Sequence, residues 1–343
     1  MYQLNMTAYD RKVYQEELRD FLPEKILDCH THIWLDSFTA AGDYNGGSTW
    51  TERVATELSA QALTDTYTQL LPDKTVTPLV FGGCLCDLQQ VNDYVYENAC
   101  RYGFPTLYRT DYSMSGEFLE TQIKQGGFLG IKPYLTNVPP YLPVDEIRIF
   151  DFLPHEHLEV CDRNGWIVML HIPRKLRLKD PVNLAQLLEI EQRYPNLKLI
   201  VAHVGRAYSR QDLGQAFDLL KDTKNMYFDF TANLCDDAIR ACIQAVGTKR
   251  IMFGSDLPIA AMRMYRITDE TGNYFNVVPR GMYADVRNDP HMLESDEENI
   301  TLMIYEQLRA LKRVAEDLAL TKEQIGDIMY ANAQCLIDAV AKK

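Results

Sequence analysis

The sequence predicts an α/β fold, a closed (β/α)8 barrel formed by a single domain over residues 1–343. Two patterns predict it: eight short apolar runs typical of strands, and amphipathic helical segments between them. Strands that alternate with helices pair in parallel through right-handed crossovers, and eight such strands close into a barrel. Barrels of this kind reach this chain length as one domain.

The predicted strands and helices follow one another along the whole chain. An N-terminal helix at about 8–21 stops before Pro23 and precedes the barrel, which covers about 25–320. The eight strands are predicted at 25–33, 75–81, 104–109, 128–133, 166–171, 197–203, 226–230 and 250–253. Helices are predicted between them at 88–102, 117–125, 155–163, 184–193, 212–220 and 236–246, and at the carboxyl terminus at about 296–318 and 322–340.

Two extended loops interrupt this alternation. The first, at 41–48, follows strand one and leads into a helix at about 51–70, and the second, at 257–295, follows strand eight. Both leave the carboxyl ends of strands, which form the face where barrel active sites lie. They are therefore candidate lids, with surface decoration as the alternative.

Composition limits the partners of the protein. Its 35 Lys and Arg residues face 48 Asp and Glu residues, which gives a net charge of −13. Nucleic acid is not an expected partner because phosphate binding needs a positive surface, and an anionic small molecule must meet local arginines. The eight cysteines lack a dense disulfide spacing, and no apolar segment approaches the roughly 20 residues that span a bilayer. We expect a cytoplasmic protein with no membrane partner, and leave a homo-oligomer open.

The most informative motif is His30-x-His32 at the end of the first predicted strand. Residues two apart on a strand project from the same face, so both imidazoles can reach one ion. The same spacing at His155-x-His157 falls in a predicted helix, where residues two apart do not face each other. We expect that pair on a helix surface, and His291 in a loop exposed to solvent.

Four more residues that can bind metal or transfer protons close other predicted strands. They are Lys132, His171, His203 and Asp256. The carboxyl ends of all barrel strands meet on one face, so these side chains are expected to lie close to the two histidines of strand one. The pattern predicts a metal site built from many strand ends.

These motifs together resemble the amidohydrolase superfamily. Among its branches the chain looks most like amidohydrolase-2, which includes aminocarboxymuconate semialdehyde and resorcylate decarboxylases and related TIM-barrel lactonases. The resemblance runs from about residue 25 to the final helix. The segments that carry it are 28–32, 127–133, 168–171, 199–205, 253–258 and 330–333.

The resemblance implies one divalent metal ion, with zinc the first expectation and manganese the second. Its implied ligands are His30, His32, His171 and Asp256. A water on such an ion is activated near neutral pH, Asp256 would act as the catalytic base, and His203 would polarise the substrate or relay protons. Asp28 is expected to support the ligands from deeper in the barrel.

Lys132 has two interpretations. In binuclear branches of the superfamily the corresponding lysine is carboxylated and bridges two metals, and His171 and His203 would then hold the second ion. In the amidohydrolase-2 branch the lysine does not usually bridge, and it would help to bind substrate or orient the strand ends. We favour one metal, with a second metal on a carboxylated Lys132 as the alternative.

Substrate-binding residues are less visible. Guanidinium groups suit a carboxylate, and aromatic rings with polar tips suit a pocket wall. The main candidates are Trp34, Tyr134, Arg174, Arg206 and Arg280, with Arg109 and Arg263 as further arginines near strand ends. The alternatives are surface ion pairs for the arginines and barrel packing for the rings.

Four functions remain open on the sequence. The first is metal-dependent hydrolysis of a small carboxylate-bearing amide, ester or lactone. The second is metal-dependent nonoxidative decarboxylation of an aromatic or muconate-type acid, in which Asp256 or His203 gives a proton to carbon. The third is a lactonase without metal, and the fourth is a catalytically silent binding barrel.

Overall fold

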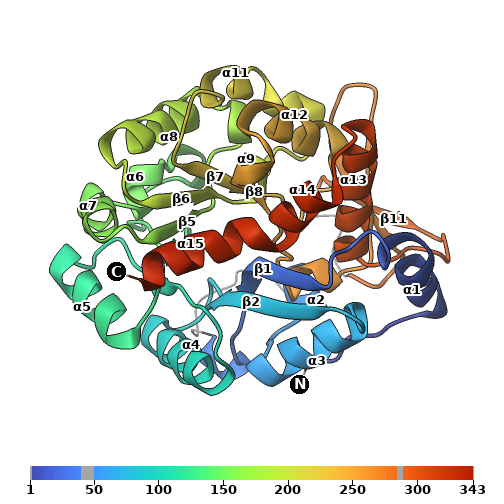
Figure 1. Ribbon diagram of the computed structural model, residues 1–343, viewed down its shortest axis with the longest axis horizontal. Helices are drawn as coiled ribbons and strands as arrows, with labels where there is room; N and C mark the ends of the chain where they lie inside the picture. Colours follow the sequence, from blue (N-terminus) through green and yellow to red (C-terminus); the bar gives the residue numbers. More distant parts are fainter. Residues whose placement is uncertain (1, 40–49, 284–288, 343) are drawn as a thin grey trace.

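The computed structural model describes residues 2–39, 50–283 and 289–342 and shows the predicted barrel (Figure 1). Its strands are β1 (Lys25–His32), β2 (Thr75–Phe81), β3 (Tyr108–Thr110), β4 (Gly130–Pro133), β5 (Ile167–Leu170), β6 (Lys198–Val201), β7 (Met226–Asp229) and β8 (Ile251–Met252). β3 to β8 form one parallel sheet in sequence order, and β1 pairs in parallel with β2.

Backbone hydrogen bonds close the barrel between these two sheets. A parallel bridge joins Val80 of β2 to Thr106 just before β3. At the other seam the Cys29 amide donates to the carbonyl of Phe253, and the Asp256 amide donates to the carbonyl of His30. The (β/α)8 fold predicted from the sequence is therefore confirmed, and this second seam sets β1 directly beside the residues that follow β8.

Helices surround the strands. They are α1 (Ala8–Val13), α2 (Trp50–Val54), α3 (Ala60–Leu70), α4 (Leu88–Tyr102), α5 (Gly116–Gly126), α6 (Ile149–Phe152), α7 (His155–Asn164), α8 (Pro181–Arg193), α9 (His203–Arg206), α10 (Arg210–Leu213), α11 (Ala216–Leu220), α12 (Asp236–Val246), α13 (Met303–Asp317), α14 (Lys322–Gly326) and α15 (Asn332–Ala341). End signals explain their bounds: in α4 the Asp87 side chain caps the amino end, and Gly103, at φ 70°, ends the helix. Among the described residues, no helix is both long enough and apolar enough to cross a membrane.

Several predicted segments differ from the structure, among them the helix predicted at 296–318, which begins only at Met303. The helix predicted at 212–220 is split into α10 and α11 because Gly214 adopts φ 49°. The helix predicted at 51–70 is likewise two helices, α2 and α3. The loop predicted at 257–295 contains a three-stranded sheet, β9 (Tyr265–Thr268), β10 (Tyr274–Pro279) and β11 (Met292–Ser295). The loop predicted at 41–48 lies outside the described residues.

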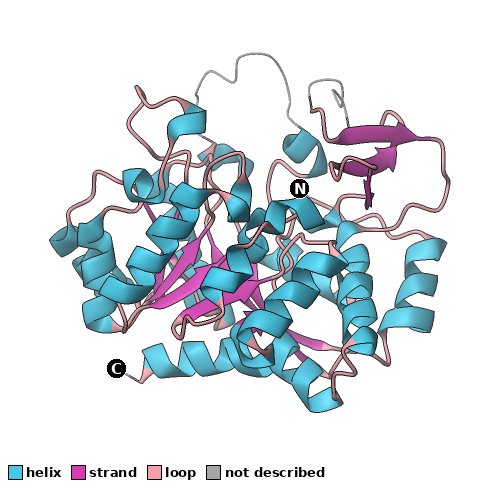
Figure 2. Cartoon of the chain, turned by 90° about the horizontal axis from the view of Figure 1, so that it is seen from above, coloured by secondary structure: helices cyan, strands magenta, loops and turns pink. Residues whose placement is uncertain are grey.

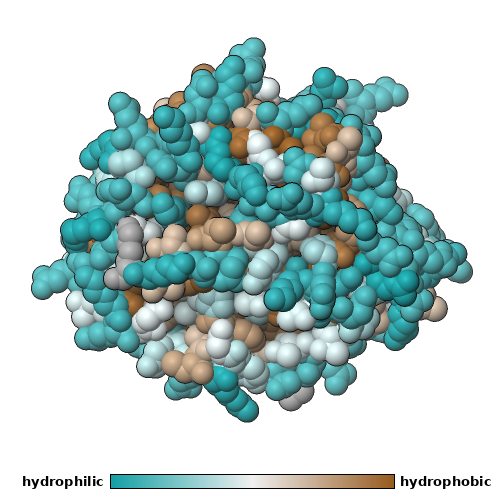
Figure 3. All heavy atoms as spheres, in the orientation of Figure 1, coloured by the Kyte–Doolittle hydropathy of each residue, from teal (hydrophilic) through white to brown (hydrophobic). Residues whose placement is uncertain are grey.

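The C-terminal helices cover the amino-terminal end of the barrel. A π-helical turn, Asp327–Ala331, joins α14 to α15, and its Ile328 carbonyl accepts a hydrogen bond from the Phe253 amide. Asn332 donates to the carbonyl of Ile251 in β8. Figure 2 shows α15 and the β9–β11 sheet on opposite sides of the barrel strands. Hydrophilic side chains cover most of the face of Figure 1, with paler and brown residues along α15 (Figure 3).

Candidate metal centre and active site

The predicted site residues meet at the carboxyl ends of the strands. His30, His203 and Asp256 offer ligand atoms that all lie within 4.8 Å of one another. His32 joins them, since its Nε2 lies 3.0 Å from Asp256 Oδ1, while Nε2 of His30 lies 3.6 Å from the same oxygen. The His171 ring lies beside this group, with its centroid 5.1 Å from that of His203.

In His30 and His203, Nδ1 donates a hydrogen bond to an oxygen that can only accept. Asp229, at the end of β7, places Oδ2 3.0 Å from Nδ1 of His30, and a carboxylate can only accept from that nitrogen. Nδ1 of His203 lies 2.9 Å from the carbonyl oxygen of Thr231, which also can only accept. Both rings therefore carry their proton on Nδ1 and leave a lone pair on Nε2.

The same reasoning applies to His32. The Tyr134 hydroxyl donates its one proton to the carbonyl of Gly82 at 2.9 Å, so it accepts from Nδ1 of His32 at 3.1 Å. The lone pair on Nε2 of His32 then faces an oxygen of Asp256, which is also an acceptor. Acceptor atoms of three imidazoles and one carboxylate thus converge on one place.

The surroundings of His30, His32 and His171 favour their neutral forms. Burial lowers the pKa of His30, His32 and His171, and the positive charge of Lys132 adds to the effect in each case. Burial also lowers the pKa of Lys132 to about 8. Its Nζ lies 3.3 Å from Nε2 of His30, so the lysine is the cation nearest to the converging lone pairs.

Asp229 is a site residue that the sequence reasoning missed. Besides holding the His30 ring, its Oδ1 accepts from the backbone amides of His203 at 2.7 Å and Thr231 at 3.1 Å. Asp28 has the buried supporting position expected for it, but it acts on the backbone: its Oδ1 accepts from the amides of His30 at 3.1 Å and Ser255 at 2.8 Å, and not from an imidazole. An acid in the apolar run 226–230 was the only signal for Asp229.

The backbone is strained where the site residues sit. Asp256 has φ 66°, and His203 to Arg206 form a left-handed turn with φ 59°, 50°, 60° and 59°. Left-handed conformations are costly for residues other than glycine and concentrate at functional sites. This tight turn directly after β6 keeps Arg206 close to His203.

Three predicted arginines are held by other groups of the chain. Arg109 is buried and donates to backbone carbonyls of the loop after β2. Arg263 pairs with the buried Asp10 of α1 at 2.7 Å. Arg280 is exposed and pairs with Asp296 at 2.7 Å. Each of the three thus has partners within the chain, and a substrate role for them stays a prediction.

The remaining substrate candidates lie nearer the mouth of the barrel. Arg174 pairs with Asp180 at 3.0 Å, whereas Arg206 donates to backbone carbonyls, those of Ile172 at 3.3 Å and Arg174 at 3.5 Å. The Trp34 ring stands 6.5 Å from that of His32 in an edge-on arrangement. Tyr134 contacts His32 directly, as described above. A substrate role for each of them stays a prediction.

Two expectations about other histidines were wrong. His155 and His157 do lie on a helix, α7, but His157 is fully buried and its Nε2 contacts the carbonyl of Met114 at 2.8 Å. His291 is partly buried, and its ring stacks on Tyr274 with centroids 4.2 Å apart. His157 is buried because its side of α7 packs against the protein. His291 is partly buried because it packs on Tyr274 of the unpredicted β9–β11 sheet.

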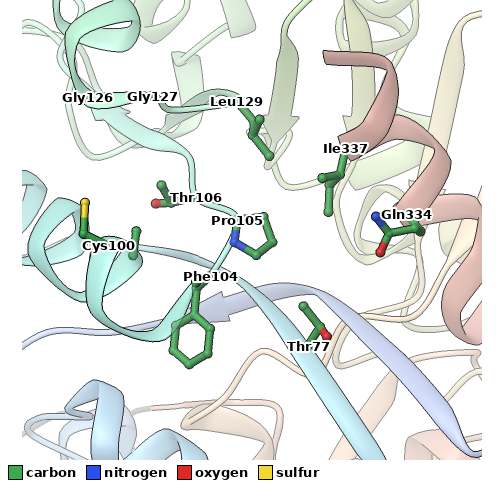
Figure 4. A pocket seen from close by; sticks show the side chains of 12 residues that line it. Thr77, Cys100, Phe104, Pro105, Thr106, Gly126, Gly127, Leu129, Gln334 and Ile337 are labelled. Atoms are coloured by element: carbon green, nitrogen blue, oxygen red, sulfur yellow. The ribbon is translucent and has the colours of Figure 1, made fainter. Parts of the chain in front are cut away.

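A cavity of about 540 Å³ lies at the other end of the barrel, under α15 (Figure 4). Pro105 and Leu129, which precede strands, line it together with Gln334 and Ile337 of α15. The His, His and Asp group found among the described residues lies elsewhere. In barrels of this kind the amino-terminal face serves stability, so we do not assign the chemistry to this cavity.

Comparison with known proteins agrees with this architecture. A sequence model of the amidohydrolase family matches residues 27–336, so the chain belongs to this family. No curated protein matches the sequence significantly.

Solved structures share the fold at low identity. An amidohydrolase from Burkholderia multivorans with bound HEPES has a TM-score of 0.61 at 14% identity, with 91% of this chain and 99% of that chain covered. A probable 2-pyrone-4,6-dicarboxylic acid hydrolase from Acinetobacter baumannii with bound citric acid has a TM-score of 0.58 at 15% identity and the same coverage. A dihydroxybenzoic acid decarboxylase from Polaromonas sp. JS666 with bound manganese and 2-nitroresorcinol has a TM-score of 0.55 at 14% identity, with 92% and 97% covered.

Proposed function

We propose that the protein is a metal-dependent hydrolase that cleaves a small carboxylate-bearing amide, ester or lactone with a metal-activated water. The observation that carries the proposal is the convergence of imidazole lone pairs on the Asp256 carboxylate at the active face of the barrel. Family membership supports enzymatic chemistry, and the family's solved relatives include hydrolases and decarboxylases.

The residues present fit a divalent ion. Lys132 Nζ lies beside Nε2 of His30, but Nε2 of His32 and Oδ1 of Asp256 are two acceptors only 3.0 Å apart. These two repel one another unless a cation lies between them, and burial disfavours protonating His32 instead. Neutral imidazoles and a carboxylate are the ligands that zinc and manganese accept. Zinc is our first expectation, because the Burkholderia relative was also solved with zinc, and manganese is the second.

Two histidines are candidates for the fourth ligand of the ion. His30, His32 and Asp256 form the core of the ligand set, and the resemblance adds His171, whose buried Nδ1 has no hydrogen-bond partner among the described residues. His203 lies within the 4.8 Å group and is the other candidate. We assign the fourth position to His171 and keep His203 for proton transfer.

A bound ion would lower the pKa of a water and polarise the scissile carbonyl. Asp256, at the centre of the converging acceptors, would take a proton from the attacking water and return it to the leaving group. His203, whose ring is fixed by its bond to the Thr231 carbonyl, presents Nε2 to the substrate and relays the proton. Lys132 offsets the negative charge that develops next to His30.

Nonoxidative decarboxylation is the second candidate, because it uses the same residues. Asp256 or His203 would then deliver a proton to the carbon that loses carbon dioxide. The manganese-containing decarboxylase among the structural relatives favours keeping this candidate. A second metal on a carboxylated Lys132 and a metal-free lactonase are the remaining alternatives.

Product analysis tests the proposal. The enzyme, stripped of metal and then reloaded with zinc or manganese, is offered lactones and esters including 2-pyrone-4,6-dicarboxylate, and in parallel 2,6-dihydroxybenzoate and 5-carboxyvanillate. We expect metal-dependent acid formation without carbon dioxide release, abolished in His203→Asn. Carbon dioxide release from the aromatic acids would favour the lyase, and activity that is unaffected by stripping would favour the metal-free lactonase.

A further inference from the structure

Two arginines and two tyrosines stack on one another beside the metal centre. Tyr208, from the loop after β6, and Tyr274 of β10 have ring centroids 5.4 Å apart. The Arg266 guanidinium of β9 lies 4.6 and 5.0 Å from these two centroids, and that of Arg177 lies 5.3 and 4.6 Å from them. Such cation–π contacts fix the planes of both guanidinium groups.

The positive charge of this cluster is only partly neutralised. Arg177 pairs with Asp212 at 2.7 Å. Arg266 donates Nε to the Asn276 side chain at 2.9 Å, and no carboxylate among residues 2–39, 50–283 and 289–342 lies within 4.0 Å of it. Arg206 also lacks a carboxylate at that distance within the described part of the chain. Two unpaired guanidinium groups therefore gather on a protein whose net charge is −13.

Hydrogen bonds place the cluster alongside the candidate metal centre. Nη1 of Arg206 donates to the carbonyl of Ile172, the residue after His171, at 3.3 Å. Nη1 of Arg266 donates to the carbonyl of Ala232 at 3.4 Å, and the carbonyl of the preceding Thr231 accepts from Nδ1 of His203 at 2.9 Å. The two arginines therefore lie beside the segments that adjoin His171 and hold the ring of His203.

The open donors suit an anion. Nε of Arg266 donates to Asn276, and Nη1 donates to the carbonyl of Ala232 at 3.4 Å. Nη2 makes no hydrogen bond within the described ranges and is available to a ligand. The Tyr208 hydroxyl makes no hydrogen bond to the described residues, and it adds a further donor next to the guanidinium groups. Planar guanidinium groups recognise carboxylates through paired hydrogen bonds.

We propose that Arg206 and Arg266, with the hydroxyl of Tyr208, bind an acidic group of the substrate that lies away from the reacting centre. This inference rests on the proposed function and specifies its substrate class. A hydrolase substrate would carry one carboxylate besides the acyl group that is cleaved. A decarboxylase substrate would carry two, because one of them leaves.

Binding of simple acids tests this subsite without any turnover. Calorimetry on the zinc-loaded enzyme compares linear dicarboxylates from succinate to pimelate with monocarboxylates of the same chain length. We expect at least one dicarboxylate to bind about tenfold tighter than its matched monocarboxylate, since a charge-assisted hydrogen bond contributes about that much. Arg266→Gln and Arg206→Gln should each remove most of this preference and leave monocarboxylate binding within twofold.

The controls separate folding, subsite and chemistry. Arg193→Gln removes an exposed guanidinium on α8 that pairs with Glu189, and it should leave the preference unchanged. Arg266→Lys keeps the charge and retains part of the preference, which a merely structural role of the residue would not predict. Equal affinity for dicarboxylates and monocarboxylates in the wild type, or an unchanged preference in both Gln variants, overturns the subsite. A preference without turnover of any compound overturns the proposed function alone.

Discussion

Replacing Asp229 by asparagine should reverse the tautomer of His30. The aspartate Oδ1 accepts from two backbone amides, at 2.7 and 3.1 Å, so the asparagine oxygen must stay there. The amide nitrogen then faces Nδ1 of His30, which lies 3.0 Å from Oδ2 in the native chain. A donor at that place requires Nδ1 to accept, so the ring proton moves to Nε2, the atom proposed to bind the metal.

The size of the effect follows from the bond that is lost. To bind the ion, His30 must return its proton to Nδ1, where it meets the N–H of the asparagine. That forfeits a hydrogen bond to a charged group, which contributes about 1.5–3 kcal/mol. At about 1.4 kcal/mol per tenfold change, metal affinity should fall about 10- to 100-fold, in line with the usual effect of losing an outer partner of a metal ligand.

Competition with a chromogenic zinc chelator measures this affinity directly. Asp28→Asn is the matched control: Asp28 is as deeply buried as Asp229 and only two residues from His30, but it contacts that residue's backbone and not its ring. We expect the control to stay within about threefold of the wild type, a range well below the tenfold step that 1.4 kcal/mol gives. A folded Asp229→Asn protein that binds zinc as tightly as the wild type would refute the reasoning about lone pairs.

Three further outcomes are expected. Elemental analysis of the purified protein should find about one divalent ion per chain, as a single four-residue ligand set implies, and two ions would favour the carboxylated lysine. Gly254→Ala should cost about 1–3 kcal/mol in urea unfolding and reduce zinc affinity, because the added Cβ would lie 2.6 Å from Cβ of His30 and 2.2 Å from Oγ1 of Thr231. Burial alone would raise the pKa of Asp10, but hydrogen bonds, led by the one from Arg263, outweigh burial and lower this pKa below 3.8. Ionised Asp10 therefore stabilises the folded state above pH 3.8, and this stability is lost as the pH falls through the lower pKa of the folded state. Asp10→Asn should cost about 3 kcal/mol at pH 7 and flatten this acid dependence in unfolding measurements.

Much of the barrel could be predicted because its signals are local. The predicted strand 75–81 and helices 88–102 and 236–246 match β2, α4 and α12 at both ends. Apolar runs and capping residues such as Asp87 mark these bounds within a few positions. The β9–β11 sheet was missed because β9 begins only nine residues after Asp256, the proposed base, where lid loops of barrels are expected.

Residue type could be predicted at the site, but the direction of each donor and acceptor could not. The positions of His30, His32 and His203 at strand ends predict a metal centre from the sequence. Which nitrogen of each ring carries the proton, however, depends on hydrogen-bond partners from other parts of the barrel. Asp229 illustrates the difference: one carboxylate of β7 orients the ring from β1 and the backbone turn after β6. It can do so only because the barrel closes and brings β1 next to β8, so the chemistry of the site is a consequence of the whole fold. A change that loosens the closing seam should therefore weaken metal binding even where every ligand is retained.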